Sequence, residues 1–169
     1  TLGVWLHQRF ADFDRAEDLD EAIRVWQQAV AAASSASAEL PDCLNNLSSG
    51  LVARYDLCGH FEDLDEAIRI WQQAVTDTQT ENPDLSMYLN NLSLSLQRRY
   101  KHSKQGEDLD RAIALWRQSV ATTPPDSFSF PGRLHNLGVG LHDRYERCGD
   151  KDDLNEAIIS DQLWNEVQD

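Results

Sequence analysis

The chain has 169 residues, of which 41% are hydrophobic and 26% are charged, a composition typical of a globular protein rather than a disordered one. Its 29 acidic residues outnumber its 15 Lys and Arg residues and give a formal net charge of −14. Because nucleic acids and anionic membranes are bound through clusters of Lys and Arg, this balance disfavours both and favours a basic or neutral partner.

One stretch occurs four times along the chain, beginning near Glu17, Glu62, Glu107 and Asp152, and defines the predicted organisation. Equivalent residues lie 45 positions apart, as Trp26, Trp71 and Trp116 do. A fixed period of this length is typical of repeat proteins, in which each unit buries its hydrophobic face only against its neighbours. Thr1 falls inside a repeat, so we expect the chain to be part of a longer array. We predict a single repeat domain over residues 1–169, with units at about 1–40, 41–84, 85–129 and 130–169.

The recurring stretch has the hydrophobic spacing of a helix, because its apolar residues follow one another at intervals of three and four. In the first copy they are Leu19, Ala22, Ile23, Trp26, Ala29 and Val30. We predict that Asp18 caps this helix and that Glu21, three residues later, completes a capping box. The equivalent residues in the other copies are Asp63 with Glu66, Asp153 with Glu156, and Asp108 without a second carboxylate.

A second kind of helix alternates with the first. Pro41 and Asp42 follow a small, polar connection at 31–40 and are predicted to begin this helix. Gly59 suits the position just past its end, as Gly149 does in the fourth unit. The apolar stripe is Leu44, Leu47, Leu51 and Tyr55 in the second unit and Leu89, Leu92, Leu96 and Tyr100 in the third.

Aromatic residues depart from the pattern at both ends and in the longest connection. Trp5 stands where the other units have Gly or Ser, Asp161 replaces the recurring Trp, and Trp164 follows it. End repeats are often atypical because one face has no neighbour, so we expect apolar surface at both ends and weak end-to-end self-association. In the longest connection, Phe130 is expected to pack beneath the loop. For Phe128, exposure and a satellite contact both stay open.

Arginine recurs in every unit shortly before the acidic start of the next helix. We expect each arginine to neutralise that acidic cluster rather than to bind a ligand. The 45-residue period would align the clusters as an acidic stripe, which can increase solubility or steer a basic partner. The arginines are Arg9, Arg54, Arg99 and Arg144.

No group of residues indicates catalysis, a cofactor or a metal. Gly138 and Gly140 lack the third glycine and the preceding strand of a dinucleotide-binding loop. His135 and His142 would lie about 10.5 Å apart along a helix, too far to share one metal ion. The acidic residues around Asp152 lack the ligand order of an EF-hand. We therefore expect that the protein is not an enzyme.

The three cysteines are expected to be reduced thiols. Cys58 and Cys148 are equivalent positions two units apart, and stacked helices lie about 8–10 Å from one another. Their sulfur atoms would therefore be beyond the reach of a disulfide, and Cys43 is left without an equivalent. This favours a cytoplasmic protein, and a disulfide framework is the alternative.

The unit resembles a tetratricopeptide repeat in a lengthened form. That family places Leu-Gly and then a bulky residue on its first helix, which Leu137, Gly138 and Leu141 match. It places a small residue and then an aromatic residue on its second helix, which Ala67 and Trp71 match. The usual unit has 34 residues, and here a longer hairpin and a longer connection extend it. The resemblance implies an all-α superhelix of about four antiparallel helix pairs.

A narrower resemblance covers nearly the whole chain. The succession of Leu89-Asn90-Asn91-Leu92-Ser93, Arg-Tyr and Glu-Asp-Leu-Asp-Glu-Ala-Ile is similar to arrays upstream of caspase-like CHAT protease domains, mainly in fungi and some bacteria. Similar arrays are sensor regions in NLR-like immune proteins. The resemblance implies a non-enzymatic sensor or recruitment array that binds a protein or peptide. The alternative is a structural spacer or self-association segment that acts through its ends.

In the tetratricopeptide family the first helix of each pair lines a concave binding face, so residues beside its apolar stripe are expected to contact the ligand. Asparagine carries both a donor and an acceptor and can pair with the backbone of an extended peptide. For Asn46, Asn91 and Asn136, a hydrogen bond between adjacent units is the competing interpretation. The lysines of the family's carboxylate clamp are absent from these sites, so a terminal carboxylate is not expected. The predicted residues are Asn45, Asn46, Ser49 and Val52, then Asn90, Asn91, Leu94, Gln97 and Arg98, and then His135, Asn136, Val139, His142 and Asp143.

Overall fold

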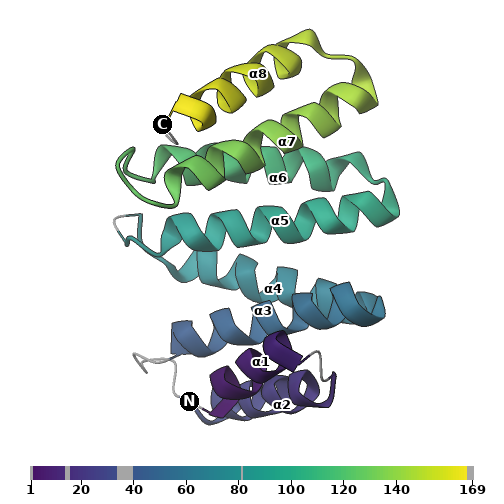
Figure 1. Cartoon of the computed structure of the whole chain (residues 1–169), viewed down its shortest axis with the longest axis vertical. Coiled ribbons are helices and arrows are strands. Elements are labelled where there is room, and N and C mark those ends of the chain that lie inside the picture. The colour runs from purple at the N-terminus through teal and green to yellow at the C-terminus, as the bar shows by residue number, and fades with distance from the viewer. Residues whose placement is uncertain (1, 14–15, 34–39, 81, 167–169) are drawn as a thin grey trace. The chain divides into compact units, whose positions relative to one another are not determined.

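The structure, a computed structural model, describes residues 2–13, 16–33, 40–80 and 82–166. These residues form eight helices and no strand, which confirms the predicted all-α architecture of four helix pairs. Most of the predicted connection at 31–40 lies outside the described residues, and no described helix is long and apolar enough to cross a membrane. In chain order the helices are α1 (Leu2–Phe13), α2 (Ala16–Ala32), α3 (Leu40–Cys58), α4 (Phe61–Asp77), α5 (Leu85–Ser103), α6 (Gly106–Ala121), α7 (Phe130–Cys148) and α8 (Lys151–Glu166) (Figure 1).

The chain divides into two compact units, residues 1–76 and 77–169, and the prediction of a single repeat domain is not tested by this division. In the first unit, α2 packs against both α1 and α3. The apolar stripes of both kinds of helix meet in one core, because a helix with one apolar face is stable only when that face is covered. The buried residues of this core are Leu6, Leu19, Ala22, Ile23, Trp26, Leu47, Leu51, Ala67 and Ile70.

The second unit contains the last four helices. Within it α6 packs against α5 and α7, and α8 packs against α7. Successive helices run in opposite directions (Figure 1). The helices α5 and α7 also contact each other, so the first helices of two adjacent repeats lie side by side. The fully buried residues include Leu92, Leu96, Leu109, Ile113, Trp116 and Leu141.

The recurring tryptophans are buried, which confirms the predicted register. Trp71, the middle one, is only 2% exposed. Trp26 lies against Gly50 and Trp116 against Gly140, so each ring fills the space left by a glycine on the first helix of the next repeat. The indole nitrogens of Trp26 and Trp116 are buried without a hydrogen-bond partner among the described residues. That arrangement costs about 1–3 kcal/mol for each nitrogen, which the burial of the ring offsets.

The predicted helix caps at Asp18, Asp63, Asp108 and Asp153 are wrong. Each second helix begins two residues earlier, so the aspartate is the third residue of the helix rather than its cap. Each of these aspartates is buried and accepts two hydrogen bonds from the arginine nine residues before it. The capping boxes are absent as well, because Glu21 and Glu66 pair with Arg24 and Arg69 and Glu156 pairs with Arg117.

The expected role of the four recurring arginines is therefore confirmed. Arg54 donates to Asp63 over 2.7 Å, and also contacts Asp20 of the preceding repeat over 2.9 Å. Arg144 makes the equivalent pair of contacts in the second unit, with Asp153 and with Asp110 of the preceding repeat. Each of these two arginines thus joins the two helices of its own repeat and a helix of the repeat before it.

In three of the repeats, the first helix ends at a residue with positive φ. Gly59 and Gly149 have φ of 72° and 74°, which confirms their predicted role. Lys104 occupies the same position in the third repeat with φ of 58°, although a side chain makes this conformation costly. Each backbone N–H donates to the carbonyl four residues earlier over 2.7–2.8 Å, which satisfies a carbonyl that the helix end leaves unpaired.

Both ends of the array show apolar surface, as predicted. Trp5 is 67% exposed on α1, where the equivalent position in the second repeat is a buried glycine. On α8 the isoleucine Ile158 is exposed, although its equivalents Ile23, Ile68 and Ile113 are buried. Self-association through these surfaces stays a prediction.

Two of the three glycines of α7, Gly132 and Gly140, provide a test of this packing. A Cβ atom at Gly140 would lie 2.4 Å from a ring carbon of Trp116, whereas a Cβ atom at Gly132 would meet nothing within 4 Å. We expect Gly140→Ala to destabilise the protein by about 1–3 kcal/mol, because the ring must move. Gly132→Ala should stabilise it by up to about 1 kcal/mol through helix propensity. Urea unfolding followed by circular dichroism measures both, and equal effects at the two sites would contradict the packing.

Candidate functional site

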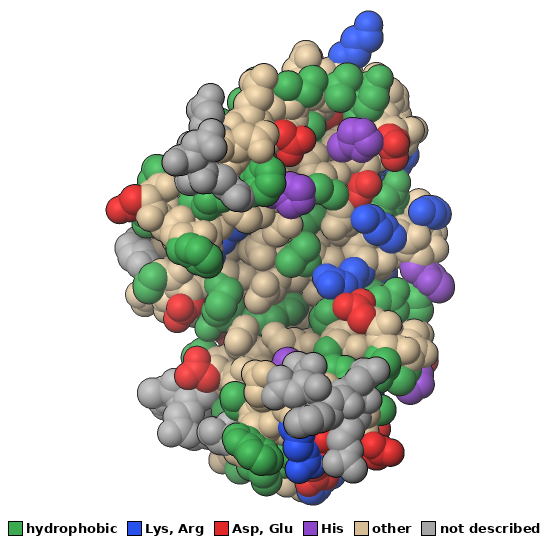
Figure 2. Space-filling view, viewed as in Figure 1, with side chains coloured by type: hydrophobic (Ala, Val, Ile, Leu, Met, Phe, Trp, Pro, Cys, Tyr) green, Lys and Arg blue, Asp and Glu red, His purple; other side chains and the backbone are tan. Residues whose placement is uncertain are grey.

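The predicted binding residues of the second unit come from α5 and α7, and all of them except Gln97 are partly or fully exposed, so they form a surface of these two adjacent helices. We call this surface the α5/α7 face. Figure 2 shows hydrophobic and histidine side chains in this region, with basic and some acidic side chains toward its right edge. The residues of the α5/α7 face are Asn90, Asn91, Leu94, Gln97 and Arg98 of α5 and His135, Asn136, Val139, His142 and Asp143 of α7.

Two polar contacts join α5 to α7 beneath this face. The side-chain amide of Asn136 donates to the side-chain carbonyl oxygen of Asn90 over 3.0 Å, so for Asn136 the interpretation as a bridge between adjacent repeats is confirmed. Seven residues further along α5, Gln97 donates to the carboxylate of Asp143 over 2.6 Å. Both contacts join positions 46 residues apart in the sequence. They therefore fix the register of the two helices.

Gln97 contributes to the support of the face rather than to its surface. Its side chain is only 8% exposed, and its amide is engaged by Asp143. Asp143 also lies 3.8 Å from the Lys101 ammonium group. The position of Gln97 beside the apolar stripe predicts a contact with the ligand, because no local signal in the sequence distinguishes a bridging glutamine from an exposed one.

The remaining residues of the face have the accessibility that a ligand needs. Leu94 and Val139 are half-buried apolar side chains on neighbouring helices, and Asn91 is half-buried as well. His135 and His142 are exposed on α7. The face thus has an apolar centre surrounded by groups that donate and accept hydrogen bonds, which is the composition of protein-binding surfaces.

The two ends of the face differ in chemistry. At the C-terminal ends of α5 and α7 lies an open pocket of about 500 Å³ with both charge signs. Its lining residues are Tyr100, Lys101, Lys104, Asp143, Glu146 and Arg147. At the other end, the ring of His135 lies 5.4 Å from the ring of Trp164, so the face continues onto an aromatic side chain of α8. The repeat pattern does not predict Trp164 as a binding residue, because this residue has no aromatic equivalent in the other repeats.

In the first unit, Asn45 and Asn46 line a pocket of about 390 Å³ between α1, α2 and α3. The pocket also contacts the buried ring of Trp26, so its wall is partly apolar. Ser49 lies on the same helix and is exposed, and Val52 is half-buried. These residues are therefore accessible, and their part in ligand binding stays a prediction.

The described residues offer little for metal chemistry. Among them no three His, Cys, Asp or Glu side chains are close enough together to hold a metal ion. The cysteines Cys43, Cys58 and Cys148 form no disulfide among the described residues. The arrangement on the α5/α7 face is an apolar strip bordered by amides and imidazoles.

No protein-family model matches the chain, and no curated protein does. Among solved structures the chain is similar to the crystal structure of a de novo designed helical repeat protein, with a TM-score of 0.46 and 16% sequence identity. That similarity covers 99% of this chain and 90% of the designed one.

The contact between Gln97 and Asp143 provides a test of how the face is held. We expect Gln97→Leu to destabilise the protein by about 1–2 kcal/mol, because a hydrogen bond to a charged group is lost. The matched control is Gln118→Leu, which places the same side chain at an exposed position of α6 and should change stability by less than about 0.5 kcal/mol. Thermal unfolding followed by circular dichroism measures both. Equal stability of the two variants would show that this contact does not couple the repeats.

Proposed function

We propose that this protein is a non-enzymatic helical-repeat scaffold that binds an extended segment of a protein partner along the α5/α7 face. The observation that supports this most is the pair of half-buried apolar side chains, Leu94 and Val139, between Asn91, His135 and His142. An apolar centre supplies the binding free energy, and the surrounding donors and acceptors fix the position of the ligand.

The dimensions of the face suit an extended peptide. Both α5 and α7 have 19 residues and are therefore about 28 Å long. An extended chain of about eight residues spans the same length. Because α5 and α7 are joined by the contacts of Asn136 and Gln97, the face is formed before the ligand arrives, which lowers the entropic cost of binding.

The net charge of the whole protein favours a basic partner, whereas the predicted acidic stripe adds little. The net charge is −14, but many acids of the predicted stripe are engaged by arginines. Asp63 and Asp20 pair with Arg54, for example, and Asp110 pairs with Arg144. The steering of a basic segment would then be long-ranged and would weaken as salt is added.

Within a longer protein, we place this scaffold in the cytoplasm as a sensor or recruitment array of the tetratricopeptide type. This assignment is supported by the resemblance of the repeated sequence motif to the arrays of CHAT-protease and NLR-like proteins. In such an arrangement, binding of the partner segment would control an attached effector. The second candidate is a self-association segment, which the exposed Trp5 on α1 and Ile158 on α8 favour.

A peptide selection tests the binding function without a known partner. Dodecapeptides are selected on the wild-type protein from a random phage-display library, and the most enriched peptide is synthesised. We expect Leu94→Glu to weaken its binding by about tenfold or more, because a charge replaces the apolar centre of the face. The matched control is Ile159→Glu, which makes the same change at an exposed position of α8. Fluorescence polarisation measures the affinities.

Two results would contradict the proposal. If no peptide is enriched on the wild-type protein, or if Leu94→Glu binds as tightly as Ile159→Glu while both remain helical, the α5/α7 face is not the binding surface. Sedimentation velocity over a concentration series separates the second candidate, because association that Trp5→Gln abolishes would assign the function to the repeat ends.

A further inference from the structure

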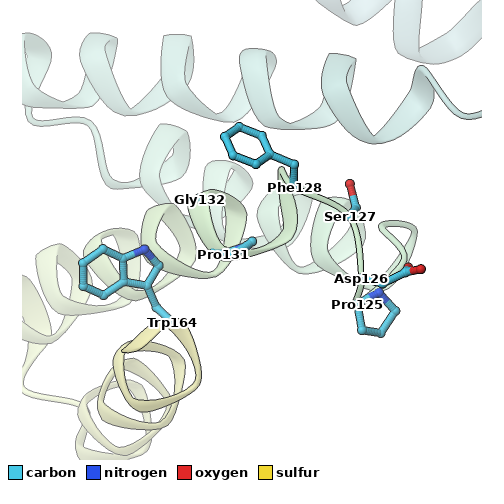
Figure 3. A pocket seen from close by; sticks show the side chains of 7 residues that line it. All are labelled: Pro125, Asp126, Ser127, Phe128, Pro131, Gly132 and Trp164. Carbon is cyan, nitrogen blue, oxygen red and sulfur yellow. The ribbon is translucent and has the colours of Figure 1, made fainter. Parts of the chain in front are cut away.

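The end of the α5/α7 face at Trp164 opens into a separate hollow within the second unit, which we call the aromatic notch. It has a volume of about 640 Å³ and lies between the loop that precedes α7 and the end of α8 (Figure 3). Its lining residues are Pro125, Asp126, Ser127, Phe128, Pro131, Gly132 and Trp164. No other repeat has an equivalent set, so the repeat pattern itself does not explain these residues.

The loop holds Phe128 away from the protein. Its side chain is fully exposed, which settles the question left open by the sequence. On one side of it the Ser127 N–H donates to Pro124, and on the other the Phe130 N–H donates to Ser127, each over 2.9 Å. These hydrogen bonds make successive turns of the loop. An ordered loop that keeps a phenylalanine ring in water gives up the free energy of burying it, which a partner can recover.

Gly132 forms the floor of the notch between the two aromatic side chains. A Cβ atom there would meet nothing within 4 Å, so the space over its backbone is open. Phe128 and Trp164 project on either side of the first turn of α7 (Figure 3). The half-buried ring of Trp164 lies 5.4 Å from the ring of His135, a residue of the α5/α7 face. The notch and the face therefore adjoin each other along α7.

The charge at the notch is acidic. Asp126 is exposed and is the one ionisable residue among the described residues of the lining, in a protein of net charge −14. The nearest arginine in sequence, Arg133, does not line the notch, because it is buried and donates to the hydroxyl of Thr123. Removal from water lowers the pKa of that guanidinium. A ligand at the notch thus meets two aromatic rings, two prolines and a carboxylate.

We propose that the aromatic notch binds one large apolar side chain of the partner segment, aromatic or leucine-like, with a lysine or arginine close to it in the sequence. The apolar side chain lies over Gly132 between Phe128 and Trp164, and the basic side chain lies beside Asp126. The remainder of the segment continues past His135 onto the α5/α7 face. This inference rests on the proposed function and names the chemistry that the partner carries.

Gly132→Leu is the sharpest variant for this test, because it fills the notch from its floor without disturbing the core. Leucine is also a better helix former than glycine, so the helix is not weakened. The peptide selection is repeated on the wild-type protein and on Gly132→Leu with the same random dodecapeptide library. Gln118→Leu, which adds a leucine at an exposed position of α6, is the matched control.

We expect the peptides enriched on the wild-type protein to share a Phe, Trp or Leu within a few residues of a Lys or Arg. Selection on Gly132→Leu should lose that apolar preference. The affinity of the most enriched peptide should fall about tenfold or more with Gly132→Leu and with Phe128→Ala, and should be unchanged with Gln118→Leu. Replacing the basic residue of the peptide should weaken binding to the wild-type protein more than binding to Asp126→Asn.

The outcomes separate this inference from the proposed function. If Leu94→Glu weakens binding but Gly132→Leu does not, or if no apolar and basic pattern is enriched, the notch is not part of the site and the inference is wrong. If Gly132→Leu abolishes binding while Leu94→Glu has no effect, the notch binds alone and the proposed use of the α5/α7 face is wrong. Enrichment of no peptide at all overturns both.

Discussion

The pairing of an arginine with the buried aspartate nine residues after it is the interaction on which the rest of the structure depends. It occurs in all four repeats, and in each the two side chains meet through two hydrogen bonds. A carboxylate in this position is costly unless it is paired, so the second helix is stable only where the arginine can reach it. The hairpin geometry of each repeat is thereby fixed by one ion pair.

The pair of Arg144 and Asp153 in the fourth repeat shows how this interaction depends on pH. Arg144 lowers the pKa of Asp153, chiefly through their hydrogen bonds. A carboxylate whose pKa is lowered in the folded state stabilises the fold fully above its ordinary pKa of about 3.9. That stabilisation is lost as the pH falls through the lowered value. At neutral pH the pair is therefore at full strength, and acid weakens its contribution to the stability of the hairpin.

The binding face is a consequence of this arrangement. Because Arg144 also contacts Asp110 of the preceding repeat, the position of α7 relative to α6 is set by the same guanidinium. With that position fixed, Asn136 meets Asn90 and Gln97 meets Asp143 between α7 and α5. The apolar strip of Leu94 and Val139 then lies on a rigid surface. The face reaches the aromatic notch where the rings of His135 and Trp164 lie 5.4 Å apart.

The features that repeat along the chain could be predicted well from the sequence. The eight helices, the buried tryptophans and the pairing of arginine with the acidic clusters follow from spacings of three, four and 45 residues. The prediction of the helix caps was wrong because an aspartate that precedes an apolar run can act either as a helix cap or as the partner in an ion pair. Only the true start of the helix, two residues earlier, separates the two roles.

The candidate site was harder to predict, because its parts are not repeated. Gln97 is equivalent to no other glutamine, and its burial depends on Asp143 in another repeat. Phe128 and Trp164 come from a loop and from the irregular last helix, where no period assigns a side chain to the inside or the outside. The sequence therefore located the face by resemblance, and the aromatic notch was visible only in the structure.

The free energy of unfolding of Arg144→Leu, measured with urea at pH 7, tests the central role of the ion pair most directly. The comparison is Arg24→Leu, which removes an arginine from an exposed pair with Glu21. Loss of Arg144 leaves the buried Asp153 without its partner and should cost about 3 kcal/mol or more, while loss of Arg24 should cost less than about 1 kcal/mol. If Arg144→Leu proves no less stable than Arg24→Leu, the hairpins are held by packing alone and the account of the fold given above is wrong.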